Sequence, residues 1–211
     1  FLSEIRNVKE PFFSTILTLT NHEPFELPGK HRFGDDTNEN KFRSTAFYTD
    51  SVLFDFLDRS RSEPWYKNTL FVIVADHGHR LPTNQHEIYD PNRYRIPLIF
   101  YGDAIRQEYR GKIISKVGSQ TDLATTLLAQ LEIPSSSFHW GKDLLDPSSK
   151  DFAFFSWDNG FGVVSPEQSI SFDNVGRQIL FKKVEKSEQD EELLDLGKAY
   201  MQSVFQQYIN Y

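Results

Sequence analysis

One short segment constrains the fold of this chain more than any other: the apolar run 70–75 (LFVIVA) with the tetrapeptide Asp76-His77-Gly78-His79 directly behind it. A run of β-branched and aromatic residues without a polar side chain is typical of a strand buried on both faces, as in a parallel α/β sheet. In open α/β sheets the ligand lies beyond the carboxyl ends of the strands. A carboxylate and two imidazoles at that edge predict a site for a divalent ion such as zinc or manganese. The alternative is a strand-end Asp that caps a loop, with exposed histidines beside it.

Composition and charge exclude several classes of protein. The 211 residues suffice for one sizeable core, or a core with a small appendage. A net charge of −7, with Lys and Arg not gathered into a basic run, argues against nucleic acid as a partner. Cysteine is absent, which excludes disulfides, thiolate metal sites and a Cys nucleophile. No stretch approaches the ~20 apolar residues of a membrane helix. The chain begins at Phe1 rather than an initiator Met, so we expect a piece of a longer protein.

Strand-like and helix-like segments alternate along the first two thirds of the chain. We expect strands at 12–20, 70–75 and 96–101, and helices at about 41–59 and 121–131. A polar excursion loop is expected at 26–40, and a second polar loop at 78–95 contains His86. This order is typical of a three-layer αβα fold of the α/β class, built on a doubly wound, mostly parallel sheet.

The pattern changes after Pro134. Short runs separated by turn dipeptides indicate an antiparallel β meander on the edge of the main sheet, with strands at 152–157, 162–165, 169–172 and 178–184. Apolar residues at helical spacing then predict a terminal helix over 188–208. We expect residues 151–211 to pack on the same domain as residues 1–150.

Several segments together resemble a known family. They are TLTNHEPF at 18–25, AFYTDSVLFDFL at 46–57, NTLFVIVADHG at 68–78, IPLIFYG at 96–102, SQTDLATTLLAQLEIP at 119–134 and GKDLL at 141–145. In this order they are similar to the alkaline phosphatase superfamily, in its lipoteichoic-acid-synthase-like sulfatase branch, which includes phosphoglycerol and phosphoethanolamine transferases. The resemblance implies that residues 1–150 are the C-terminal half of a sulfatase-like αβα catalytic domain.

The resemblance also implies roles for four residues. Asp76 and His77 are implied to be ligands of one divalent metal ion, Mn or Zn, which would neutralise charge on a transferring phosphoryl group. His22 matches a histidine that contacts the substrate phosphate, and its alternative is a loop histidine packed against its neighbours. His86 lies in the loop expected to roof the site and is a second candidate for substrate binding. His79 is expected to be solvated or to lie behind the ligands.

Other polar residues in these segments are expected to be structural. Asp122 opens a helix, where the helix dipole favours a carboxylate. Asp50 lies within the helix at 41–59, and Arg80 is either a phosphate contact or a surface residue. No role is assigned to His31 or His139.

The chain departs from the family at its N-terminal side. The nucleophilic Thr or Ser and a nearby acidic ligand belong to a half that precedes TLTNHEPF, and residues 1–11 are too short to supply them. We therefore expect no catalytic nucleophile in this chain and no activity from the isolated chain, because displacement needs both partners.

The resemblance further implies where the protein acts and on what. It implies a phospholipid head group or another phosphodiester as substrate, and attachment to the cell membrane through an upstream segment. The catalytic domain would then lie on the extracytoplasmic (periplasmic) side, and the isolated chain is expected to self-associate. Two alternatives stay open: a sulfatase that hydrolyses sulfate esters, and a non-catalytic α/β binding module.

Overall fold

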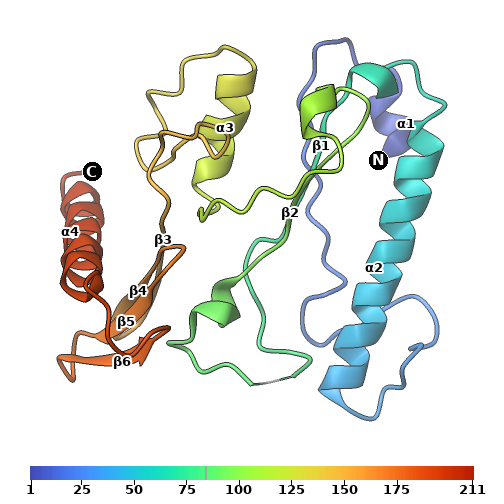
Figure 1. Cartoon of the computed structure of the whole chain (residues 1–211). Helices are drawn as coiled ribbons and strands as arrows, with labels where there is room; N and C mark the ends of the chain where they lie inside the picture. The colour runs from blue at the N-terminus through green and yellow to red at the C-terminus, as the bar shows by residue number, and fades with distance from the viewer. Residues whose placement is uncertain (84) are drawn as a thin grey trace. The chain divides into compact units, whose positions relative to one another are not determined.

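The computed structural model describes residues 1–83 and 85–211, which form two compact units. The first unit comprises residues 1–75, 79–85 and 97–112, and the second comprises 76–78, 86–96 and 113–211. Figure 1 shows the helices and strands of both units. The expected division at residue 150 stays a prediction.

The first unit contains a long helix and a two-stranded sheet. Its elements are α1 (Leu2–Ile5), α2 (Asn38–Ser60), the 3₁₀ turn η1 (Tyr66–Asn68), β1 (Phe71–Val74), β2 (Leu98–Tyr101) and the 3₁₀ turn η3 (Gln107–Tyr109). Helix α2 begins three residues before the expected start because the Thr37 side chain accepts a hydrogen bond from the backbone N–H of Asn40 and caps it. A small aromatic core forms around Ile5, Trp65 and Tyr66.

The sheet of the first unit differs from the expected one in two respects. Strands β1 and β2 pair antiparallel, with Phe71 opposite Tyr101 and Val74 opposite Leu98, so the described strands show no parallel pair. The four residues of β1 are half-buried rather than fully buried, because β1 has β2 as its single hydrogen-bonded neighbour in the described sheet.

The strand expected at 12–20 is wrong for this structure. The segment has no strand assignment, and residues 13–19 are exposed, with Phe13 at 88% and Leu19 at 72%. A β-rich sequence becomes a strand only when a neighbouring strand accepts its backbone hydrogen bonds. No described strand pairs with this segment.

The second unit confirms the four expected antiparallel strands and both helices, but the described strands form a sheet of their own rather than the edge of a main sheet. Its elements are the 3₁₀ turn η2 (Pro91–Tyr94), α3 (Asp122–Gln130), β3 (Ala153–Trp157), β4 (Gly160–Val164), β5 (Ser169–Asp173), β6 (Gln178–Lys182) and α4 (Asp190–Ile209). The four strands form one antiparallel sheet in sequence order. Figure 1 shows α4 lying along this sheet.

The core of the second unit forms where α4 meets the sheet. Phe161, Val163 and Ile170 are 1% exposed and pack against Leu193 of α4. Gly197 lets the helix approach closely, because a Cβ at this position would collide with the ring of Phe161. The sheet and α4 are thus closely packed against each other.

Candidate active site

The candidate metal ligands form a tight turn directly after β1. The backbone N–H of His77 donates to Asp76 Oδ1 over 3.0 Å. The ring of His77 donates from Nδ1 to the carbonyl of Gly78 over 2.8 Å, which leaves Nε2 as the lone-pair nitrogen of the neutral ring. This Nε2 lies 3.8 Å from Asp76 Oδ2, and both side chains are about two-thirds exposed or more. The turn therefore presents one carboxylate oxygen and one imidazole nitrogen side by side.

This pair fits a divalent ion in chemistry and in tautomer. Carboxylate oxygen and imidazole nitrogen bind zinc at about 2.0–2.2 Å, and a ligating histidine donates its other ring N–H to a carbonyl or carboxylate. The bond from Nδ1 of His77 to the Gly78 carbonyl has that form. Two donors are fewer than the three or four of a zinc site, and the described residues contain no group of three or more His, Asp and Glu side chains placed to hold a metal. The chain supplies part of a site.

Two backbone contacts hold the turn in place. Gln120, just before α3, donates from Nε2 to the carbonyl of Asp76 over 3.2 Å. Gly78 lies so close to η2 that a Cβ would collide with the carbonyl oxygen of Arg93. A glycine is therefore required at position 78 by close packing, a reason that the motif alone does not disclose.

His86 belongs to the same unit as this turn. Its Nδ1 lies 2.7 Å from Asp90 Oδ2, so the ring donates to the carboxylate. Partial burial raises the pKa of Asp90, but the hydrogen bonds from Asn92 and His86 outweigh it and hold that pKa below its usual value. Asp90 is thus a carboxylate at neutral pH. Asp90 is not among the residues that the sequence motifs single out; its position four residues after His86 is the signal that could have found it.

His22 lies in the first unit, in the turn that follows segment 12–20. Asn21 fastens this turn to α2, because its amide oxygen accepts a hydrogen bond from Thr49 Oγ1 over 2.6 Å. Phe25 closes the turn as a buried residue with φ of 64°. The His22 ring donates from Nδ1 to the carbonyl of Glu23 over 2.7 Å, so donation from Nε2 to a phosphate oxygen needs the doubly protonated ring.

The remaining candidates have structural surroundings. His79 is half-buried and stacks on Phe42 at 4.9 Å between ring centroids, which does not match a solvated ring; the other alternative, a place behind the ligands, stays a prediction. Asp122 is 2% exposed at the start of α3, and its Oδ2 accepts a hydrogen bond of 2.7 Å from Lys142 Nζ. Arg80 and Asp50 are exposed. The structure thus groups Asp76, His77 and the His86 loop in one unit.

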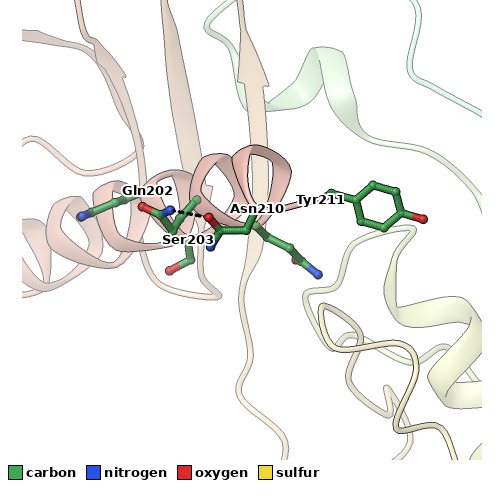
Figure 2. A pocket seen from close by; sticks show the side chains of 6 residues that line it. Gln202, Ser203, Asn210 and Tyr211 are labelled. Atoms are coloured by element: carbon green, nitrogen blue, oxygen red, sulfur yellow. Dashed lines mark hydrogen bonds between the residues drawn. The ribbon is translucent and has the colours of Figure 1, made fainter.

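Two hollows in the described surface of the second unit add no second candidate. One of about 560 Å³ lies beside the end of α4, where Gln206 donates from Nε2 to Asn210 Oδ1 over 3.2 Å. Figure 2 shows the neutral side chains that line this hollow. It is lined by Gln202, Ser203, Gln206, Gln207, Asn210 and Tyr211. Another of about 330 Å³ contains Asp122 and Lys142, whose charges already pair with each other.

Comparison with known proteins places these observations in a family. Residues 1–133 match the family model described as Sulfatase. The lipoteichoic acid synthase-like protein YvgJ of Bacillus subtilis is 27% identical over 168 residues, which cover 71% of this chain and 27% of that protein. A crystal structure of an alkaline phosphatase superfamily protein from Vibrio parahaemolyticus superposes with a TM-score of 0.78 at 21% identity, over 98% of this chain and 51% of that one. The lipoteichoic acid synthase LtaP from Listeria monocytogenes superposes with a TM-score of 0.67 at 18% identity, over 92% of this chain and 52% of that one.

The fold is therefore that of the alkaline phosphatase superfamily, a class of α/β enzymes, as the resemblance implied. The chain belongs to the sulfatase family, and its relatives by sequence lie in the lipoteichoic-acid-synthase-like branch. Members of this family are transferases or hydrolases that generally use a divalent metal ion. The chain spans about a quarter of the curated relative and about half of each solved structure.

Proposed function

We propose that this chain is the C-terminal part of a metal-dependent transferase or hydrolase that acts on phosphoryl esters, with phosphoglycerol or phosphoethanolamine head groups as substrates. Membership of the sulfatase family supports the reaction class. The names of YvgJ and the Listeria structure, both of the lipoteichoic acid synthase type, support the substrate class. The observation that carries the proposal is the pairing of Asp76 with a His77 tautomer suited to metal binding.

In this proposal Asp76 and His77 hold one divalent ion, Mn or Zn, together with ligands from outside the chain. When bound, the ion neutralises charge on the phosphoryl group and lowers the pKa of the nucleophile. No residue of this chain is proposed as the catalytic nucleophile. The nucleophilic Thr or Ser is proposed to lie upstream. Gln120 and Gly78 keep the two ligands in position through the contacts described above.

His22 and His86 are proposed to bind the phosphodiester substrate. A doubly protonated His22 ring donates from Nε2 to a phosphoryl oxygen while Nδ1 stays on the carbonyl of Glu23. His86, held by Asp90, offers Nε2 from the loop next to the metal-binding turn. Each of these contacts would help to hold the ester in place.

The site of action is proposed to be the outer side of the cell membrane. Lipid head groups are the proposed substrates, and an upstream segment is the proposed membrane attachment. Within the described residues, no helix has the length and apolar character needed to cross a bilayer. The net charge of −7 gives no support to nucleic acid as a partner.

The test uses the full-length protein and the double variant Asp76→Ala/His77→Ala. We expect the variant to lose stoichiometric Mn or Zn, measured by elemental analysis, and to lose turnover of phospholipid head groups. The matched control, Asp50→Ala/His139→Ala, removes the same residue types from exposed positions and should keep both. Metal retained at wild-type stoichiometry in the first variant would overturn the ligand assignment.

A parallel assay with an aryl sulfate separates the alternatives. Turnover of the sulfate ester alone would make the protein a sulfatase in activity as well as in family. A wild-type protein that holds no metal and turns over neither substrate would be a binding module.

A further inference from the structure

The contact between His86 and Asp90 determines which ring nitrogen of His86 faces outward. Asp90 is an acceptor at neutral pH, so the proton of the imidazole lies on Nδ1, 2.7 Å from Oδ2. The other oxygen of Asp90 accepts from the backbone N–H of Asn92 at 2.9 Å and from Asn92 Nδ2 at 3.0 Å. Both carboxylate oxygens are therefore engaged, and the carboxylate cannot rotate without losing hydrogen bonds. With 34% and 18% of the two side chains exposed, the pair is half-buried, and water competes for it only in part.

The loop that carries this pair is fixed to the candidate metal-binding turn. Asp90 caps η2, and η2 in turn presses the carbonyl of Arg93 against Gly78. A displacement of η2 would therefore reach the turn of Asp76 and His77 directly.

The same loop is also fixed to the C-terminal sheet. The ring of Tyr94 stacks on Phe155 of β3, with 4.2 Å between centroids. Ser171 of β5, which is fully buried, donates from Oγ to the carbonyl of Tyr89 over 2.6 Å. Tyr94 further donates its hydroxyl to the carbonyl of Ile88 over 2.7 Å. These contacts hold the loop at Ile88, Tyr89 and Tyr94.

We propose that Asp90 is a positioning residue for this reaction, which fixes His86 in the tautomer that carries its proton on Nδ1 and turns Nε2 toward the substrate. The proposal rests on the proposed function, since the substrate is the phosphoryl ester named there. In the neutral ring, Nε2 accepts a hydrogen bond from a hydroxyl of the substrate or acceptor; in the charged ring, Nε2 donates to a phosphoryl oxygen. In both states Nδ1 donates to Asp90, so the carboxylate serves either contact.

The sheet of β3–β6 holds the loop of Asp90 in place through the same contacts. It lies outside the matched range 1–133 of the family model, yet Phe155 and Ser171 hold the loop of Asp90. The C-terminal sheet thus acts as a support for the candidate site.

The decisive variant is Asp90→Asn, in the full-length protein. Asparagine remains a good helix cap, so its side-chain oxygen still accepts from Asn92. Its amide nitrogen, however, donates where the carboxylate accepted, so His86 must offer the lone pair of Nδ1 and move its proton to Nε2. The matched control is Glu87→Gln, which removes one negative charge from an exposed residue of the same loop.

Two readouts distinguish positioning from a merely structural role. Ring ¹⁵N chemical shifts of labelled histidines, assigned with His86→Asn, should show the switch of tautomer in Asp90→Asn and no switch in Glu87→Gln. The value of kcat/KM on the phosphodiester should fall about 10- to 100-fold, by analogy with residues that orient metal-ligating histidines. The melting temperature of Asp90→Asn should stay close to that of the wild type, because the cap persists.

Either of two results would overturn the proposal: an unchanged tautomer in Asp90→Asn, or a switched tautomer with kcat/KM within about twofold of wild type. The ring spectrum does not depend on activity. A wild-type protein without turnover would therefore refute the proposed function, while the spectrum still decides whether Asp90 sets the tautomer.

Discussion

At the scale of single residues, the candidate site depends on groups whose neighbours fix them. His77 is oriented by the carbonyl of Gly78, and His86 is oriented by Asp90. Gly78 matters twice, because its carbonyl orients His77 and its missing side chain admits η2. Small changes at such positions therefore act on the site without removing a ligand.

Replacing Gly78 with Ala should weaken metal binding. The new Cβ collides with the carbonyl of Arg93, so the turn or η2 must shift, at a cost of about 1–3 kcal/mol. Isothermal titration of the full-length protein with Zn or Mn would measure the loss of affinity, and denaturant unfolding the loss of stability.

The control for this change is Gly176→Ala. There the nearest atom to a new Cβ is the carboxylate oxygen of Asp173, a side chain that can move. Metal affinity of Gly78→Ala equal to that of Gly176→Ala would show that the packing of the turn on η2 does not matter for the site.

At the scale of elements, buried polar networks join the helices of the second unit to their neighbours. Asp122, at the start of α3, accepts hydrogen bonds from the backbone N–H groups of Ser119 and Lys142 as well as from the Lys142 ammonium. Gln168 is fully buried and bonds to Val184 and to Asp190 at the start of α4. Each network ties a helix N-terminus to a loop far away in sequence.

Replacing Asp122 with Ala should lower the free energy of unfolding by about 3–5 kcal/mol, because Lys142 keeps a largely buried charge without its partner. The double variant Asp122→Ala/Lys142→Met should lose less than the sum of the two single variants. Asp195→Ala breaks an exposed pair with Lys198 and should cost less than about 1 kcal/mol in the same urea titration. Additive losses in the double variant would mean that the two charges do not interact.

The start of α4 should make stability depend on pH. The hydrogen bond from Lys182 at 2.5 Å, followed by that from Gln168, lowers the pKa of Asp190 below its usual value. A carboxyl with a lower pKa in the folded state stabilises the fold above its unfolded pKa, and this contribution disappears as the pH falls through the folded value.

In Asp190→Asn the free energy of unfolding should therefore fall less steeply than in the wild type as the pH drops below about 4. Urea midpoints measured from pH 6 to pH 2.5 would test this, with the exposed neighbour variant Glu191→Gln as control. An acid limb as steep in Asp190→Asn as in the wild type would contradict the assignment.

At the scale of the whole molecule, apolar side chains are exposed in both units. Phe13, Leu17 and Leu19 of the first unit are 88%, 71% and 72% exposed, and Ile113 of the second is 95% exposed. Segments of this kind favour association, because burial of apolar surface is favourable at about 25 cal/mol per Å². The exposed residues 13–18 also lie in no described strand, so their backbone groups can pair with another strand.

The 211-residue chain prepared alone should therefore associate, bind metal weakly and turn over neither phosphodiester nor sulfate ester. Light scattering would measure association, and isothermal titration with Zn or Mn would measure the metal affinity. The variant Phe13→Ser/Leu17→Ser/Leu19→Ser should associate less, whereas Tyr208→Ser/Ile209→Ser at the exposed end of α4 tests the other apolar surface. A monodisperse chain with tight metal and measurable turnover would refute this view of the chain.

The sequence by itself determined the local elements and the family. Apolar periodicity located α2, α3, α4 and the strands β3–β6 to within a few residues, because each forms from contacts close in sequence or from a sheet that folds back at short turns. The ordered motifs identified the superfamily, and the apolar run before Asp76 placed the candidate ligands at the end of β1. The assignments of Asp76, His77, His22 and His86 stay predictions.

Only the tertiary structure decided the pairing of strands and the surroundings of the side chains. The pattern of residues 12–20 and of β1 is the same whatever strand lies beside them, so sequence alone could give neither the missing strand nor the antiparallel partner β2. The contacts of Gly78 with Arg93, of His79 with Phe42 and of Asp122 with Lys142 join residues that are 15 to 37 positions apart. Such contacts form when separate elements pack together, and no local pattern encodes them.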